Sequence, residues 1–113
     1  MLRPAGWWIA VEPIDLRCGM DRLLVRVQTD LGRDAFDGAA YVFRNRAGTR
    51  IKLLCCDAQG VWLCVRRLQR GRFVWPRPGD ALCELSREQF DWLAAGVDWQ
   101  RLSLRTETQN RLL

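Results

Sequence analysis

The sequence predicts an α+β fold, with a single antiparallel sheet of consecutive hairpins, a long N-terminal helix packed on one face, and a short C-terminal helix. Three observations support it. Residues 41–76 hold three runs rich in Val, Ile, Leu and aromatics, separated by the turn sequences Asn45–Gly48 and Asp57–Gly60. Residues 15–31 repeat apolar positions at helical spacing. Apolar residues make up 49% of the 113-residue chain, enough for the core of one domain.

The N-terminal part of the chain predicts a strand and then a helix. The apolar run Trp7–Val11 predicts the strand, and Pro13 ends it because proline cannot donate to a ladder. Asp15 suits a helix N-cap, since its carboxylate can accept orphan backbone N–H groups. Five apolar residues then predict one buried face of a helix over residues 15–31, and Gly32 suits the position after it. The five are Met20, Leu23, Leu24, Val27 and Leu31.

The middle of the chain predicts two hairpins. Strand 41–44 pairs with strand 49–57 across the first turn, and strand 61–67 pairs back across the second. A last short strand is expected over 81–85. Both the odd-numbered and the even-numbered positions of these strands include apolar residues, so both faces of the sheet are partly apolar. One face is expected to carry the long helix, and the other a partial cover or a partner.

The C-terminal part predicts a helix and a tail. Ser86 opens the helix, with Gln89 at the third position of a capping box. The sequence after Trp99 is polar and weakly patterned. The chain is therefore divided into a single α+β domain, residues 1–99, and a polar C-terminal tail, residues 100–113.

The positive charge is concentrated in the middle of the chain. Residues 41–77 carry nine basic groups against one acid, which gives +8, whereas the chain as a whole carries +5. A localised positive face suits nucleic acid or an acidic surface on a protein. The alternative, that the arginines only keep one side of a sheet solvated, stays open.

Two basic groups are candidate nucleic-acid contacts, because arginine and lysine neutralise phosphates and release counterions. They are Arg44, Arg46, Arg50 and Lys52 around the first hairpin, and Arg66, Arg67, Arg70 and Arg72 around the following turn. Phe73 and Trp75 alternate after that turn and are candidates for stacking on exposed bases, with core packing as the favoured alternative.

No catalytic site, metal site or cofactor is predicted. The chain has no His, and its five Cys form no C-x-x-C pair. Phosphate-binding glycine motifs are absent. A nuclease would need carboxylates such as Asp15 and Asp57 to converge in space. The odd number of Cys, without a signal peptide or a membrane-length apolar stretch, predicts a reduced, cytoplasmic chain.

A set of short motifs over residues 7–99 resembles one known family. The motifs are Asp15–Arg17, Phe36–Gly38, Val42–Arg46, Ile51–Leu54, Asp57 with Gly60, Arg67–Pro76, Leu85–Gln89 and Leu93–Asp98. In these motifs the chain resembles the TnpB accessory protein of the insertion-sequence sixty-six family, an Orf-two-like transposition protein. The block Arg67–Pro76 is the most specific part. Cys55 and Cys56 stand where that family usually has an aromatic pair.

The resemblance implies a non-enzymatic accessory role in transposition of an insertion sequence, beside a separate and larger transposase. The implied partners are DNA at the element ends and the transposase of the same element, with a homo-oligomer as a further candidate and no membrane. The alternative is a protein-interaction module that docks on the transposase without touching DNA. No cofactor is implied.

Overall fold

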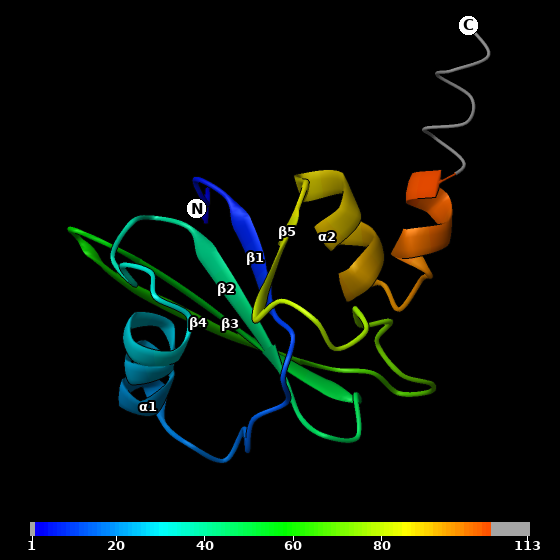
Figure 1. Cartoon of the computed structure of the whole chain (residues 1–113), viewed down its shortest axis with the longest axis horizontal. Helices are drawn as coiled ribbons and strands as arrows, with labels where there is room; N and C mark the ends of the chain where they lie inside the picture. The colour runs from blue at the N-terminus through cyan, green and yellow to red at the C-terminus, as the bar shows by residue number, and fades with distance from the viewer. Residues whose placement is uncertain (1, 105–113) are drawn as a thin grey trace, which may run out of the picture.

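The computed structural model describes residues 2–104, and within them five strands form one mixed sheet in the order β4-β3-β2-β1-β5 (Figure 1). The strands are β1 (Trp7–Ala10), β2 (Ala40–Arg44), β3 (Arg50–Asp57), β4 (Gly60–Arg67) and β5 (Leu82–Leu85). The helical elements are α1 (Met20–Val25), the π-helical turn η1 (Arg26–Asp30) and α2 (Arg87–Ala94). Residues 99–104 are helical as well.

The prediction of a wholly antiparallel sheet is wrong, because β1 runs parallel to β2. Trp7 lies opposite Ala40 in that pair, and β1 pairs antiparallel with β5 on its other side. Parallel neighbours need a long crossover that returns the chain to the same end of the sheet. The connection between β1 and β2 supplies this crossover and contains α1. The first strand therefore lies inside the sheet, next to β2.

The predicted long N-terminal helix is also wrong. Instead of 15–31, α1 covers only Met20–Val25 and continues as the wider turn η1. Asp15 does not cap it, because its carboxylate accepts from the backbone N–H of Arg17 and pairs with the Arg17 guanidinium at 2.7 Å. These hydrogen bonds lower the pKa of Asp15 to about 2. The turn that they close replaces the first predicted turn of helix.

Both predicted hairpins are present within this different sheet. Val42 of β2 lies opposite Leu53 of β3, and Leu54 of β3 lies opposite Leu63 of β4. The run that follows β4 does not add a strand to the ladder. Phe73 instead donates its backbone N–H to the carbonyl oxygen of Gly48 at 2.8 Å, which holds the run beside the first hairpin turn.

The predicted capping box opens α2. The Ser86 hydroxyl accepts from the backbone N–H of Gln89 at 3.1 Å, and the Gln89 side chain accepts from the backbone N–H of Ser86 at 2.8 Å. One turn later the ring of Phe90 stacks on Trp7 of β1, with centroids 4.2 Å apart. The cap and the ring stack together fix α2 against the sheet.

The start of the predicted tail is helical. Within the helix over 99–104, Ser103 accepts a hydrogen bond from the Gln89 side chain at 2.8 Å. Trp99 is buried and donates its ring N–H to the carbonyl oxygen of Val74 at 2.7 Å. Residues 105–113 lie outside the described part of the chain, so the division into a domain and a tail stays a prediction.

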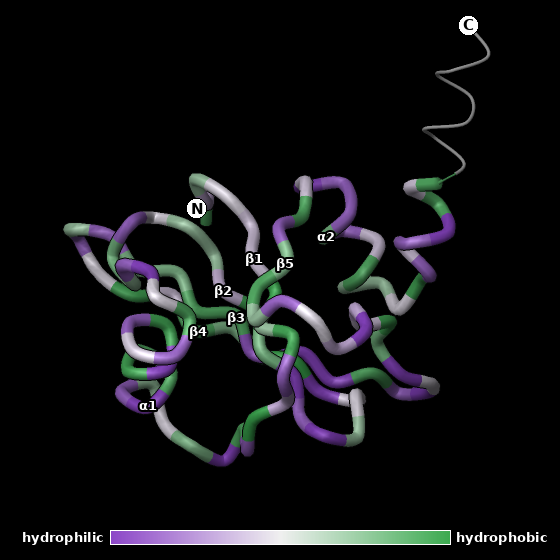
Figure 2. The backbone as a smooth tube through the Cα atoms, in the orientation of Figure 1, coloured by the Kyte–Doolittle hydropathy of each residue, from purple (hydrophilic) through white to green (hydrophobic). Residues whose placement is uncertain are grey.

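The sheet carries a hydrophobic core on each face, and Figure 2 shows apolar residues concentrated along its strands. The core on the α2 face is built from Ile9, Ala40, Val42, Ile51, Leu53, Cys55, Phe73, Leu85, Leu93 and Trp99. The core on the α1 face is built from Ala10, Leu16, Leu23, Val27, Ala35, Ala39, Tyr41, Phe43, Leu54 and Cys56. Successive side chains of β2 and β3 point to opposite faces of the sheet, and they therefore divide between the two cores.

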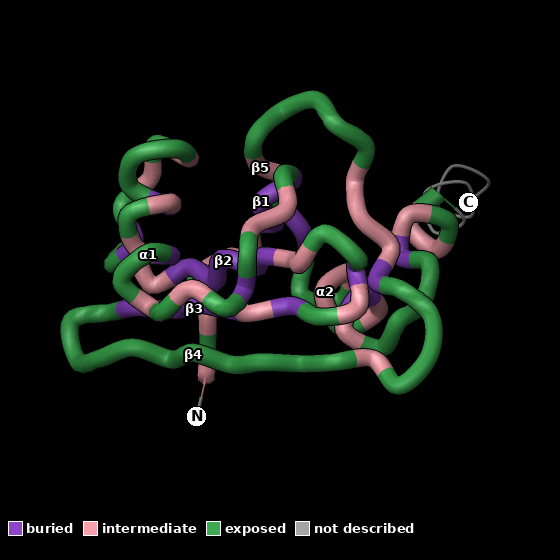
Figure 3. The backbone as a smooth tube through the Cα atoms, turned by 90° about the horizontal axis from the view of Figure 1, so that it is seen from below, coloured by how far each residue is buried: buried purple, intermediate pink, exposed green. Residues whose placement is uncertain are grey.

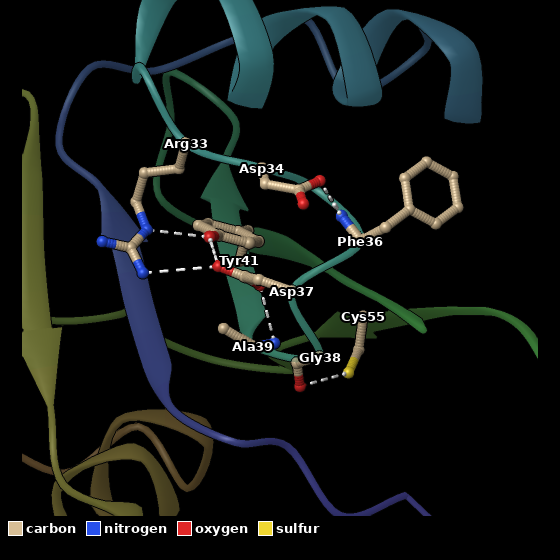
Figure 4. A network of polar contacts seen from close by, with 8 residues as sticks. All are labelled: Arg33, Asp34, Phe36, Asp37, Gly38, Ala39, Tyr41 and Cys55. Atoms are coloured by element: carbon tan, nitrogen blue, oxygen red, sulfur yellow. Dashed lines mark hydrogen bonds and ion pairs between the residues drawn. The ribbon is translucent and has the colours of Figure 1, made fainter. Parts of the chain in front are cut away.

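A polar network closes one edge of the α1-face core (Figure 4). The buried Tyr41 hydroxyl donates to the Asp37 carboxylate at 2.7 Å and accepts from the Arg33 guanidinium at 2.9 Å. That guanidinium also lies over the ring of Trp8, 4.2 Å from its centroid. Burial, followed by the hydrogen bond to Asp37, raises the pKa of Tyr41 to about 12.

The raised pKa of Tyr41 predicts an alkaline transition that is readily observed. Tyr41 is the only tyrosine of the chain, so tyrosinate absorbance reports this group alone. We expect a midpoint of about 12 in the folded protein, against the ordinary 10.0 in denaturant. The neutral phenol is the form that the fold favours, so its contribution to stability is complete below about pH 10 and is lost as the pH rises towards 12.

A titration midpoint near the ordinary value in the folded protein would contradict this description of the network, since the phenol would then be open to water. The control is the Tyr41→Phe variant, which removes the absorbance change. That variant should also lose about 1–2 kcal/mol of unfolding free energy, because Asp37 and Arg33 lose their buried partner.

Candidate nucleic-acid interface

The fold brings the two predicted basic groups to the same end of the sheet. Leu68 donates its backbone N–H to the carbonyl oxygen of Thr49 at 3.0 Å, and Phe73 donates to Gly48 at 2.8 Å. The turn between β2 and β3 and the turn after β4 are therefore hydrogen-bonded neighbours, although about twenty residues separate them in the sequence.

Asn45 shapes the first of these turns. Its side-chain oxygen accepts from the backbone N–H groups of Thr49 and Arg50 at 3.0 and 3.1 Å. Gly48 has a φ of 74°, which glycine adopts without steric cost. A Cβ at Gly48 would lie 3.7 Å from the Cβ of Arg72, so the two turns are in close contact.

The C-terminal end of α2 supports the second turn. Arg66 donates from Nε to the carbonyl oxygen of Ala94 at 2.6 Å, where cations complement the helix dipole. Gly96, with a φ of 77°, faces Leu68 so closely that a Cβ there would lie 3.3 Å from a methyl group of Leu68. Arg66 and Leu68 therefore position the turn that carries the other arginines.

Five exposed arginines form what we call the basic end. They are Arg46, Arg50, Arg67, Arg70 and Arg72. Three ion pairs join described residues, and none of them includes a member of the basic end. Within residues 2–104, the guanidinium groups of the basic end also donate no hydrogen bond. Their charges are thus available to an external anion.

Two members of the basic end face each other directly. Arg50 of β3 lies opposite Arg67 of β4. Leu68 donates its backbone N–H to Thr49, so these two residues form a hydrogen-bonded pair. The adjacent pair, Arg50 and Arg67, is therefore of the non-hydrogen-bonded kind, in which the two residues lie closer together. Like charges in such a pair are destabilising. An anion bound between them would remove that repulsion.

The other predicted basic residues have structural contacts. The half-buried Arg44 places its guanidinium 5.8 Å from the ring centroid of Trp75. Lys52 donates to the carbonyl oxygen of Cys18 at 3.2 Å and so ties the loop before α1 to β3. Together with Arg66, these two side chains are partly engaged within the protein and are less available than the basic end.

The two aromatic candidates serve the core. Phe73 is 4% exposed and belongs to the α2-face core. Trp75 is partly buried and donates its ring N–H to the carbonyl oxygen of Ala10 at 2.9 Å. A base could not stack on Phe73 without opening the fold.

Comparison with known proteins places the chain in a family. The model of the family described as "IS66 Orf2 like protein" matches residues 5–104. The chain belongs to this family.

Two relatives come from Sinorhizobium fredii (strain NBRC 101917 / NGR234). Uncharacterized protein y4hO is 42% identical over 82% of this chain and 81% of its own length. Uncharacterized protein y4jC is 34% identical over 83% and 80%. No solved structure matches the chain.

Membership of the family gives the chain an accessory role associated with transposition of an insertion sequence. The family is not known as an enzyme. Within the described part of the chain, no helix is long and apolar enough to cross a membrane. The nucleic-acid-binding residues stay a prediction.

The acids that a nuclease would need lie apart. Asp15 lines a cavity of about 400 Å³ together with the Asn45–Ala47 turn. Asp57 is the last residue of the eight-residue strand β3, whose first residue follows that turn. Its carboxylate accepts a hydrogen bond from the backbone N–H of Gln59 in the next turn. Among residues 2–104, no group of three or more potential metal-binding side chains is found.

The contacts of Arg66 and Arg67 predict different effects of two neighbouring substitutions. Arg66→Ala should lower the unfolding free energy by about 1 kcal/mol, because the end of α2 loses a charge-assisted hydrogen bond. Arg67→Ala should change it by less than about 0.5 kcal/mol, since its side chain has no partner in the described chain and faces a like charge. Denaturant unfolding measures both, and equal losses would contradict this assignment.

Proposed function

We propose that this accessory protein acts in transposition by binding the DNA of its element through the basic end, without catalysing a reaction itself. The observation that carries the proposal is the gathering of five exposed arginines, unpaired within the described chain, at one end of the sheet. Arginine offers planar, bidentate contacts that fit phosphate oxygens. The basic end is therefore complementary to a nucleic-acid backbone.

The position of the arginines also suits a backbone contact. Arg46 comes from the β2–β3 turn, Arg50 and Arg67 from paired strands, and Arg70 from the turn after β4. The backbone hydrogen bonds between the two turns hold in place the backbone that carries these groups, so little backbone order has to be imposed when DNA binds. Contacts of this kind position a protein on a duplex, whereas contacts to base edges would specify sequence.

The same proposal places the protein beside the separate transposase of the element. We infer that the protein assists the transposase by holding or marking DNA that the transposase then processes.

Binding of labelled element-end duplex and random duplex across a salt series tests the proposal. We expect the affinity to fall steeply with salt, and the Arg67→Ala/Arg70→Ala double variant to bind more weakly. Its slope of log K against log salt should be shallower by about 2, because each lost phosphate contact removes about 0.9. Preference for element ends would define a site-recognition factor, whereas equal binding would define an auxiliary clamp.

The matched control is Arg3→Ala/Arg87→Ala, which removes the same net charge from two exposed arginines outside the basic end. It should bind almost as the unmodified protein does. Equal weakening of both double variants would show that net charge, and not the basic end, is responsible. Absence of DNA binding would overturn the proposal and would favour an acidic surface on the transposase as the partner of the basic end.

A further inference from the structure

The free edge of the sheet is a long and unusually apolar strand. β4 is one of the two outermost strands, β5 being the other, and all eight residues of β4 are exposed. Figure 3 shows it along one margin of the molecule as a continuous exposed stretch. The large apolar side chains on it are Val61, Trp62, Leu63 and Val65, which are 39%, 48%, 40% and 61% exposed. Edges of this length and composition are usually shortened, covered or charged, because they pair with other strands.

The pairing of β4 with β3 fixes which backbone groups remain free. Leu68 donates to Thr49, and hydrogen-bonded pairs alternate along an antiparallel ladder. Trp62, Cys64 and Arg66 therefore direct their backbone N–H and C=O groups towards β3. The remaining residues of the edge direct theirs outwards. They are Val61, Leu63, Val65 and Arg67.

The charges on this edge indicate what covers it. Asp57 lies at one end of the β3–β4 hairpin, and Arg66 and Arg67 lie at the other. A second copy running antiparallel along β4 would bring the end of each hairpin that carries Arg66 and Arg67 beside the Asp57 end of the other hairpin. A parallel copy would place arginine on arginine. The edge is therefore complementary to itself in one direction only, as a two-fold symmetric interface requires.

We propose that the chain forms a symmetric dimer by antiparallel pairing of β4 with β4 of a second copy. The outward backbone groups belong to alternate residues, so the register that pairs all of 61–67 centres on Cys64. Val61 then lies opposite Arg67 of the second copy, and Leu63 opposite its Val65, as hydrogen-bonded pairs. The two five-stranded sheets become one continuous sheet.

Two side-chain pairs support this register. Trp62 lies opposite Arg66 of the second copy, where a guanidinium and an indole face attract each other. The two Cys64 residues face each other across the two-fold axis as a non-hydrogen-bonded pair, with Cα atoms about 4.5 Å apart. That separation falls within the range that a disulfide spans, about 4.4–6.8 Å. Cys64 is also the exposed cysteine of the chain, whereas Cys55 and Cys56 are buried.

This inference does not rest on DNA binding. The dimer nevertheless affects the proposed DNA contact, because the two basic ends would lie at opposite ends of the β4–β4 pair. A dimer could then contact two separate stretches of backbone. Arg67 lies on the edge, but Arg67→Ala keeps the backbone N–H and C=O groups that pair in the dimer. Loss of DNA binding in the arginine variants and loss of the dimer in the position-64 and Leu63→Pro variants are therefore separate outcomes.

Charge placed on the two-fold axis is the sharpest test. Light scattering of the unmodified protein should give the mass of a dimer, and Cys64→Ser should keep it. Cys64→Lys and Cys64→Glu should each be monomeric, because two like charges then face each other. An equimolar mixture of these two variants should recover the dimer. All three variants change only the exposed position 64, so no core contact is changed.

A backbone variant tests the edge independently of charge. Leu63→Pro removes an N–H that points away from β3, a position where an edge strand tolerates proline, and it should yield a folded monomer. Under a mild oxidant the unmodified protein should form a covalent dimer that Cys64→Ser does not form. A monomeric Leu63→Pro supports the edge, and the Cys64 cross-link supports the register.

Three outcomes overturn the proposal. A monomeric unmodified protein at micromolar concentration would show that the edge stays free. A dimer that persists in both Cys64→Lys and Leu63→Pro would show a different interface. A dimer that dissociates in these variants but gives no Cys64 cross-link would overturn the stated register.

Discussion

The apolar side chains on both faces of β2 and β3 impose the constraint on which the structure depends. Neighbouring residues such as Leu53 and Leu54 belong to different cores, so neither face of the sheet can remain in water. The crossover with α1 covers one face. The other is covered by α2, the helix over 99–104 and the segment around Phe73, which its backbone hydrogen bond to Gly48 holds in place.

Covering the α2 face also produces the basic end. The segment that follows β4 must turn back across the first hairpin turn to bury Phe73, and this path brings the arginines of the two turns together. The same packing separates the basic residues by role. Arg44, Lys52 and Arg66 hold neighbouring segments, whereas Arg50 and Arg67 remain opposite each other with no acid between them.

The two cores draw buried residues from β1, β2 and β3 but none from β4 among the described residues, and α2 contacts β4 through the hydrogen bond from Arg66 to Ala94. β4 forms backbone hydrogen bonds with β3 along one of its edges, and its apolar side chains are exposed. The basic end is an electrostatic surface and the β4 edge is formed by backbone and apolar groups, and the two surfaces adjoin at Arg67, which belongs to both.

Local patterns in the sequence by themselves determined the two hairpins, the capping box at Ser86, the alternation along β3 and the family, because each depends on residues close together in the chain or on short motifs. Only the tertiary structure decided the place of β1, the length of α1 and the sorting of the arginines. Periodicity cannot distinguish a turn closed by Asp15 and Arg17 from a first turn of helix. The direction of β1 depends on where a long crossover returns, and the burial of Phe73 depends on contacts between distant segments.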